Sequence, residues 1–189
     1  MQGLIGPLKE LAEFEELCKN KKKDAGMIRV CGCVNSQKSH MMYAIGDGCK
    51  YKVIACSSET KAKQIYEEYR FLDSNTYLYP AKDFLFYQAD IRSKELVKQR
   101  MEGIQAVLSG EPVTVVTSLD GFMDHLAPKE SIAEKVLKVQ NDSVLKLDEM
   151  AEKLSVIGYD REVQVEGPGQ FAVRGGILDI YPLTEELPV

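Results

Sequence analysis

The sequence is poor in the residues and segments that several classes of protein require. Its 189 residues include no tryptophan and only two histidines, His40 and His125, which leaves little material for a histidine-dependent hydrolase. No apolar run approaches the roughly 20 residues of a transmembrane helix. The first residues, MQGLIGPLKELAEF, lack the basic and apolar regions of a signal peptide. We therefore expect a cytoplasmic protein without membrane partners.

The chain also lacks an excess of positive charge, because 24 Lys and Arg residues face 29 Asp and Glu residues and the formal net charge is −5. A domain that binds nucleic acid on its own usually carries a basic surface. The five cysteines form an odd, irregularly spaced set, which is typical of reduced thiols in a cytoplasm. Cys31 and Cys33 would share one face of an expected strand, whereas zinc sites usually show two spaced pairs of ligands. We therefore expect no metal site.

Residues 27–118 alternate between short apolar segments and amphipathic ones. Expected strands at 27–34, 51–56, 76–80 and 112–117 are separated by expected helices near 57–72 and 91–108. This order predicts a parallel sheet with right-handed crossovers, which is the α/β class. The turn-rich segment LAPKES at 126–131 then interrupts the pattern. We place a domain boundary there, with domains at 1–126 and 127–189.

The second domain has a different pattern. Strands are expected at 133–140 and 159–166 and in the segments QFAVRG and GILDIYP, with one helix from 145 to 157 that ends at Gly158. This predicts a small α+β domain with an antiparallel sheet. The final residues, LTEELPV, look like a loop that leads into another strand, so we expect the last strand or strands of this domain to be absent.

The segment from Gly32 to Ser39 is close to a phosphate-binding P-loop, G-x-x-x-x-G-K-[ST]. Gly32, Lys38 and Ser39 match the pattern, but Gln37 replaces a glycine that lets the backbone curl around phosphate. The segment is therefore a degenerate P-loop, a working nucleotide site or a chance match. The pair Asp148-Glu149 superficially resembles a metal-holding acidic box, but it lies at the start of an expected helix, where acids are ordinary.

The most informative segment is Gly167-Pro-Gly-Gln-Phe-Ala-Val-Arg174-Gly-Gly-Ile-Leu-Asp-Ile-Tyr-Pro182. It predicts two strands and a glycine turn, with Arg174 at the end of an apolar strand. One interpretation is an exposed arginine that pairs weakly with Glu162 or Asp179. The other is an arginine on a flat sheet that captures carboxylates of a partner protein. The residues alone do not separate the two.

This segment resembles one shared by the bacterial excision-repair protein UvrB and the transcription-repair coupling factors, roughly G-x-[FY]-x-x-R-G-x-[IVL]-[IVL]-[DE]-[IL]-[FY]-P. The aromatic loop at 78–91, Arg100 in the next helix, and Val113–Met123 resemble the coupling factors as well. Two departures from UvrB favour the coupling factors: Gln37 in the P-loop, and no room after Tyr87 for a DNA-gripping hairpin. The chain is thus similar to the N-terminal UvrB-homology region of the coupling factors.

The resemblance implies a RecA-like UvrB domain 1a with a degenerate P-loop, followed by a UvrB domain 2-like module that binds UvrA. It implies that Arg174 contacts UvrA, with Arg161 and Phe171 as further candidates, and that Ala172 replaces an arginine of UvrB.

The function it implies is non-catalytic recruitment of UvrA to stalled transcription in nucleotide excision repair. In full-length coupling factors, ATP, magnesium, RNA polymerase and DNA would be bound elsewhere by an ATP-dependent DNA translocase. The alternative is a UvrB-like ATP-binding domain of a repair helicase. Direct DNA binding is disfavoured by the acidic charge and the missing hairpin.

Overall fold

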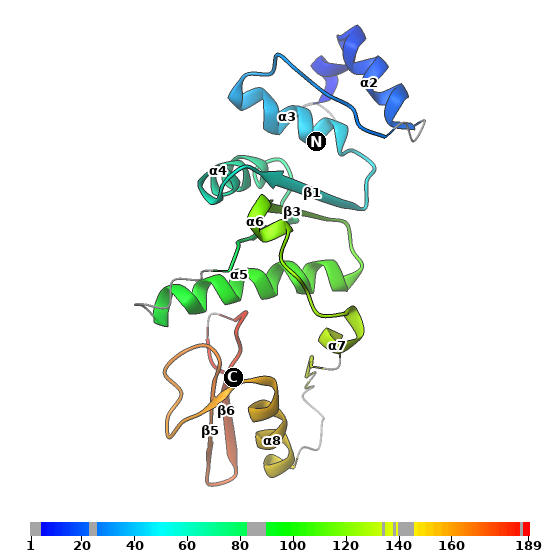
Figure 1. Ribbon diagram of the computed structural model, residues 1–189. Helices are drawn as coiled ribbons and strands as arrows, with labels where there is room; N and C mark the ends of the chain where they lie inside the picture. Colours follow the sequence, from blue (N-terminus) through cyan, green and yellow to red (C-terminus); the bar gives the residue numbers. More distant parts are fainter. Residues whose placement is uncertain are drawn as a thin grey trace. The chain divides into compact units, whose positions relative to one another are not determined.

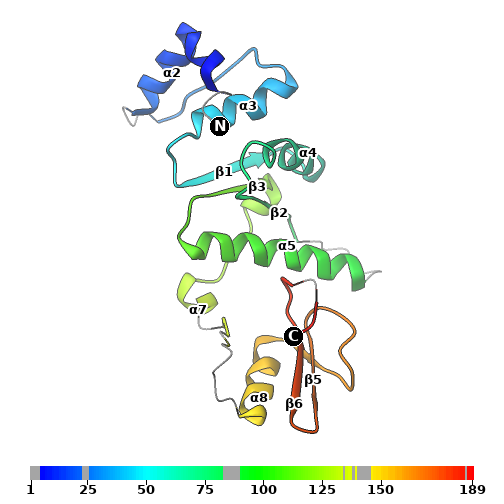
Figure 2. The ribbon, with the colours of Figure 1, turned by 180° about the vertical axis from the view of Figure 1, so that it is seen from behind.

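A computed structural model describes residues 5–22, 26–82, 90–133, 135–137, 139, 146–185 and 187–189. The chain divides into two compact units. Unit one comprises Met1–Ala81 and Ser109–Phe122, and unit two comprises Lys82–Leu108 and Met123–Val189. Figures 1 and 2 show the elements of both units from opposite sides.

The elements of unit one are a 3-10 helix η1 (Gly6–Glu10), helices α2 (Ala12–Lys22), α3 (Asn35–Ile45), α4 (Glu59–Tyr69) and α6 (Leu119–Phe122), and strands β1 (Tyr51–Cys56), β2 (Thr76–Tyr79) and β3 (Val113–Ser118). Those of unit two are helices α5 (Asp90–Ser109), α7 (Lys129–Ala133) and α8 (Leu147–Ile157), and strands β4 (Asp160–Arg161), β5 (Gln170–Arg174) and β6 (Ile177–Tyr181).

The sheet of unit one is parallel, in the order β1-β3-β2. This confirms the predicted α/β class and three of the four expected strands. The expected strand at 27–34 is wrong, because none of these residues pairs with a strand in the described part of the chain. Gly32 has a φ of +87°, which interrupts the extended run. Met27 is 91% exposed, so its apolar side chain is not in the core.

Helix α4 covers one face of this sheet, as Figure 1 shows. The Ser58 hydroxyl caps the helix by accepting the N–H of Lys61 at 3.3 Å, as expected for a serine before an apolar periodic segment. Ala62 and Ile65 of the helix are buried against Val116 of the central strand. This packing removes apolar surface from water, which is the main source of stability for such a layer.

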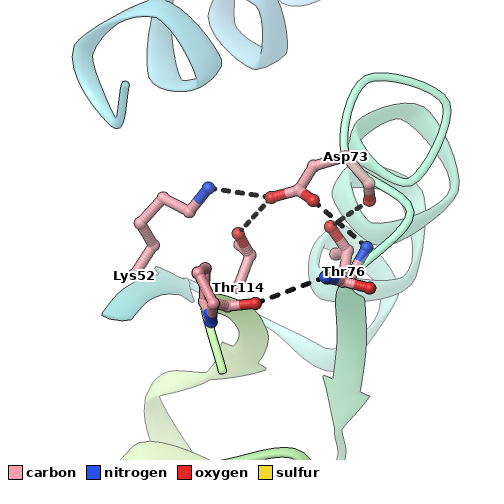
Figure 3. Close-up of polar contacts among 6 residues, drawn as sticks. Lys52, Asp73, Thr76 and Thr114 are labelled. Atoms are coloured by element: carbon pink, nitrogen blue, oxygen red, sulfur yellow. Dashed lines mark hydrogen bonds and ion pairs between the residues drawn. The ribbon is translucent and has the colours of Figure 1, made fainter. Parts of the chain in front are cut away.

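A polar network joins the amino ends of all three strands of unit one (Figure 3). Asp73 accepts hydrogen bonds from Lys52 on β1 and from Thr114 on β3, each at 2.8 Å. Its backbone carbonyl accepts the Thr76 hydroxyl of β2 at 2.6 Å. Burial, the largest effect, would raise the pKa of Asp73, but the hydrogen bonds from Lys52 and Thr114 hold that pKa below its ordinary value.

In unit two, α8 packs against a separate three-stranded sheet in the order β4-β5-β6. The helix ends at Gly158, whose φ of +101° is the left-handed cap predicted there. Strands β5 and β6 form the expected hairpin. The pair β4 and β5 is parallel, however, so the sheet is mixed and the prediction of an antiparallel sheet is wrong in this respect.

The expected strand at 133–140 is wrong, and the one expected at 159–166 is much shorter than predicted. Of 133–140, the described residues form the end of α7 and irregular backbone, and residues 134, 138 and 140 lie outside the described part. Of 159–166, only Asp160 and Arg161 pair with a neighbouring strand. The loop after them is instead held by the Gln170 side chain, whose Oε1 accepts the N–H groups of Glu166 and Gly167 at 2.9 Å each.

The boundary between domains 1–126 and 127–189 stays a prediction. In the structure, all residues from Met123 onward belong to unit two. Residues 82–108, which include most of α5, belong to that unit as well. Within the described residues, no helix is long and apolar enough to cross a membrane.

Candidate functional site

The segment that resembles a P-loop forms the start of α3 and is closed by its own hydrogen bonds. The Gln37 Oε1 accepts the backbone N–H of Val34 at 3.2 Å. The backbone N–H groups of Gln37 and Lys38 donate to the Val34 carbonyl at 3.0 and 3.2 Å. In a P-loop such N–H groups point at the phosphates. Here three of them are already bonded within the loop, and the glutamine takes part in that closure.

The two residues that would serve phosphate and magnesium are also engaged. The Ser39 hydroxyl is 3% exposed and donates to Glu68 Oε2 on α4 at 2.7 Å. That hydrogen bond is the main reason why the pKa of Glu68 is below its ordinary value. Lys38 Nζ lies 3.4 Å from Asn35 Oδ1 on the surface. Gly32 has open space where a Cβ would stand.

The carboxyl edge of the parallel sheet, where open α/β sheets usually bind ligands, is occupied by a side chain of the protein. Glu59, the first residue of α4, accepts the N–H of Ala81 after β2 at 3.0 Å. It also accepts the hydroxyl of Ser118 at the end of β3. The Ser118 oxygen in turn accepts the N–H of Gly121 at 3.0 Å. This edge is therefore satisfied internally.

Within the described part of the chain, the cysteine pair considered as a metal site lies in no group of potential metal ligands. Cys31 is exposed and Cys33 is partly exposed. Among the residues that the structure describes, no three His, Cys, Asp or Glu side chains lie close enough to hold a metal ion. Asp148 and Glu149 occupy the first turn of α8, and Glu149 pairs with Lys146 at 2.8 Å on the surface.

In unit two, the β5-β6 hairpin presents a distinct set of side chains. Its turn is Gly175-Gly176, with φ values of +54° and +93°, so both residues adopt conformations that favour glycine. Two consecutive positive φ angles suit the twist of a two-residue hairpin. The turn places Arg174, the last residue of β5, directly opposite Ile177, the first residue of β6.

One face of this hairpin packs on α8 and forms the core of unit two. Phe171 of β5 forms a buried cluster with Met150 and Leu154 of the helix, and Val173 and Leu178 pack against this cluster. Phe171 is 0% exposed. Its ring therefore lies in the core of unit two, and its role as a UvrA contact stays a prediction that would require the ring to leave this core. In the structure the ring fixes the sheet on the helix.

The opposite face carries Arg174, which lies on the surface with a 58% exposed side chain. Its Nη2 donates to Asp179 Oδ2 at 2.5 Å, so the pairing with Asp179 that the sequence suggested is present. The Asp179 side chain is 29% exposed. An exposed pair of this kind adds little to stability, at most about 1 kcal/mol. The pairing does restrict where the guanidinium points.

The register separates Arg161 from Arg174. Arg161 is opposite Phe171, which faces α8, whereas Asp160 is opposite Gln170, which shares the face of Arg174. A shift of one residue along a strand exchanges its two faces, so the structure does not bring the two arginines onto one face. Arg161 is exposed at the end of its short strand. Ala172, where UvrB has an arginine, is 0% exposed between its neighbours.

Ile177 was missed from the sequence. It is 64% exposed on the face of Arg174. The signal that could have revealed it is the spacing Arg-Gly-Gly-Ile. In a two-residue hairpin, the residues that flank the turn are cross-strand neighbours.

Comparison with known proteins connects this hairpin with a family. Residues 137–189 match the UvrB interaction domain family. The chain is 35% identical over 117 residues to a transcription-repair-coupling factor of Bacillus subtilis (strain 168), covering 62% of this chain and 10% of that protein. Coupling factors of Staphylococcus epidermidis and Staphylococcus aureus are 32% identical over 111 residues and 30% identical over 118 residues. These matches cover 59% and 62% of this chain.

These findings confirm the resemblance to the UvrB-homology region of the transcription-repair coupling factors. The chain spans about 10% of the length of each of these relatives. The family match begins before α8 and includes the whole β4-β5-β6 sheet, so the hairpin that presents Arg174 lies inside it.

Proposed function

We propose that this chain is a non-catalytic interaction module of a transcription-repair coupling factor, and that it recruits UvrA to stalled transcription complexes through unit two. The observation that carries the proposal is Arg174, an exposed and oriented guanidinium inside the segment that matches the UvrB interaction domain. A guanidinium offers two donor edges to a carboxylate, and arginine is enriched among the residues that dominate protein interfaces.

Unit one would then serve as a scaffold without nucleotide chemistry. The internal bonds of Gln37, Ser39 and Glu59 support this, because each engages a group that a nucleotide or its magnesium would need. The alternative of a UvrB-like ATP-binding domain would require all three to rearrange. We assign ATP, magnesium, RNA polymerase and DNA, which the resemblance implies for coupling factors, to regions other than those matched here.

The proposal is tested by calorimetric titration of the 189-residue chain with UvrA. Arg174→Glu should weaken binding by more than tenfold, because at least about 1.4 kcal/mol is expected when a central arginine meets its carboxylate with the wrong charge. The matched control is Lys153→Glu on the exposed side of α8, which makes the same change of charge in the same unit.

Binding of UvrA by the wild-type chain, with a large loss in Arg174→Glu and little in Lys153→Glu, would support the proposal. Salt should weaken the wild-type complex more than the Arg174→Glu complex. Equal losses in both variants would mean that net charge rather than this site controls binding. A folded wild-type chain that does not bind UvrA would refute the proposed function.

A further inference from the structure

The end of the β5-β6 hairpin combines a charged and an apolar side chain in one small area. Arg174 and Ile177 are direct cross-strand neighbours on the face that points away from α8. Ile177 is 64% exposed, although it is one of the larger aliphatic side chains. A single exposed isoleucine is ordinary. Its position beside an exposed arginine, at a turn of two positive-φ glycines, sets it apart from the other exposed apolar residues of unit two.

Asp179 orients the guanidinium group of Arg174 by accepting a hydrogen bond from it. It lies two residues beyond Ile177 on β6 and therefore on the same face. The hydrogen bond from Arg174 Nη2 to Asp179 Oδ2 engages one nitrogen of the guanidinium, and the side chain remains 58% exposed. The rest of the donor fork is available to a second carboxylate. Holding one nitrogen in place also reduces the rotamer freedom that binding would otherwise remove.

We infer that Ile177 is a specificity-determining contact for UvrA and that Asp179 is a positioning residue for Arg174. This inference rests on the function proposed above. The inference requires a UvrA surface with a carboxylate beside an apolar patch, so that the carboxylate meets Arg174 while the patch covers Ile177. Apolar cover excludes water from the ion pair, which strengthens it.

The other candidates of unit two fit this role less well. Phe171 is fully buried, and Arg161 is on the opposite side of the register. Of the residues that the described register places on the Arg174 face, Arg174 is the cation and Asp160 and Asp179 are anions. The guanidinium donors that Asp179 leaves unbonded therefore favour an acidic group next to the apolar contact.

The contact of Ile177 is tested with Ile177→Thr, which keeps a β-branched side chain in the strand but removes apolar surface. Its control is Val156→Thr on α8, where the valine is 77% exposed. We expect Ile177→Thr to weaken UvrA binding about tenfold, and Val156→Thr to leave it unchanged within about twofold.

If Arg174→Glu abolishes binding while Ile177→Thr binds like wild type, this inference is overturned and the proposed function stands. If the wild-type chain does not bind UvrA, both are overturned.

The positioning role is tested by a double-mutant cycle. Asp179→Asn should weaken binding about fivefold in the wild-type background, the cost of ordering one long side chain at the interface. In an Arg174→Ala background it should have no effect, because the group that it positions is gone. An equal loss in both backgrounds would show that Asp179 acts through the fold or contacts UvrA itself. No loss in either would show that Arg174 needs no positioning.

Discussion

Removing the carboxylate of Glu59 should destabilise unit one strongly, although the residue lies at the start of a helix, where many substitutions are tolerated. The Glu59→Ala variant loses the acceptor for the Ala81 N–H and for the Ser118 hydroxyl. Ser118 is 0% exposed, so water cannot replace the lost bond without a rearrangement. Hydrogen bonds to charged groups are worth about 1.5–3 kcal/mol each, so we expect a loss of about 3–5 kcal/mol after partial relaxation.

A comparison of three variants separates this effect from the helix dipole. Glu59→Gln keeps an oxygen acceptor but removes the charge, and it should cost about 1 kcal/mol, which includes the loss of a favourable charge in the first turn. Glu67→Ala on the exposed side of the same helix should cost less than about 0.5 kcal/mol, because its ion pair with Arg70 is at 3.9 Å and exposed.

The measurement is urea unfolding followed by hydrogen exchange in peptides from β1 and β3, which report on unit one alone. The reasoning is refuted if Glu59→Ala is as stable as Glu67→Ala. It is also refuted if Glu59→Gln and Glu59→Ala lower the free energy of unfolding by the same amount. The difference between the two variants measures the contribution of the side-chain oxygen that accepts the hydrogen bonds.

Two further predictions concern unit one. The pKa of Asp73 is below its ordinary value of 3.8 when folded, so its network stabilises the fold above that pH, and this contribution is lost as pH falls through the lower folded pKa. Asp73→Asn should therefore flatten the decline of melting temperature in acid, and an unchanged acid profile would contradict this assignment. Adding ATP and magnesium should leave the melting temperature of the chain unchanged, because Ser39 and Gln37 are bonded internally. An upward shift at millimolar nucleotide would reinstate the ATP-binding alternative.

The regular elements could be predicted where local signals agreed with a buried environment. The segments YKVIAC and PVTVVT are apolar, bounded by turns and joined through helices, and both became strands of the parallel sheet. The segment at 27–34 is similarly apolar, but a strand also needs a partner edge, and composition does not reveal whether one is available. The alternating pattern at 159–166 predicted a longer strand than the structure contains for a related reason. Hydrogen bonds to the Gln170 side chain hold the end of that segment as a loop.

The site was predictable in part. Arg174 stood out as an arginine in an apolar strand before two glycines, and its partner Asp179 was one of the two considered. The faces of Phe171 and Arg161 could not be assigned from the sequence, because it does not fix the register of a strand as short as β4. Once the register is known, both assignments follow from alternation along β5.

That register has a consequence for how this surface could change over evolution. Asp160 and Arg161 are adjacent in sequence, but they have opposite charges and lie on opposite faces of the sheet. Losing or gaining one residue between Gly158 and Asp160 would exchange them, and the anion on the face of Arg174 would become a second cation. No codon for a charged residue would need to mutate. The charge beside Arg174 is therefore set by the length of a short connection as well as by which charged residues the strand contains.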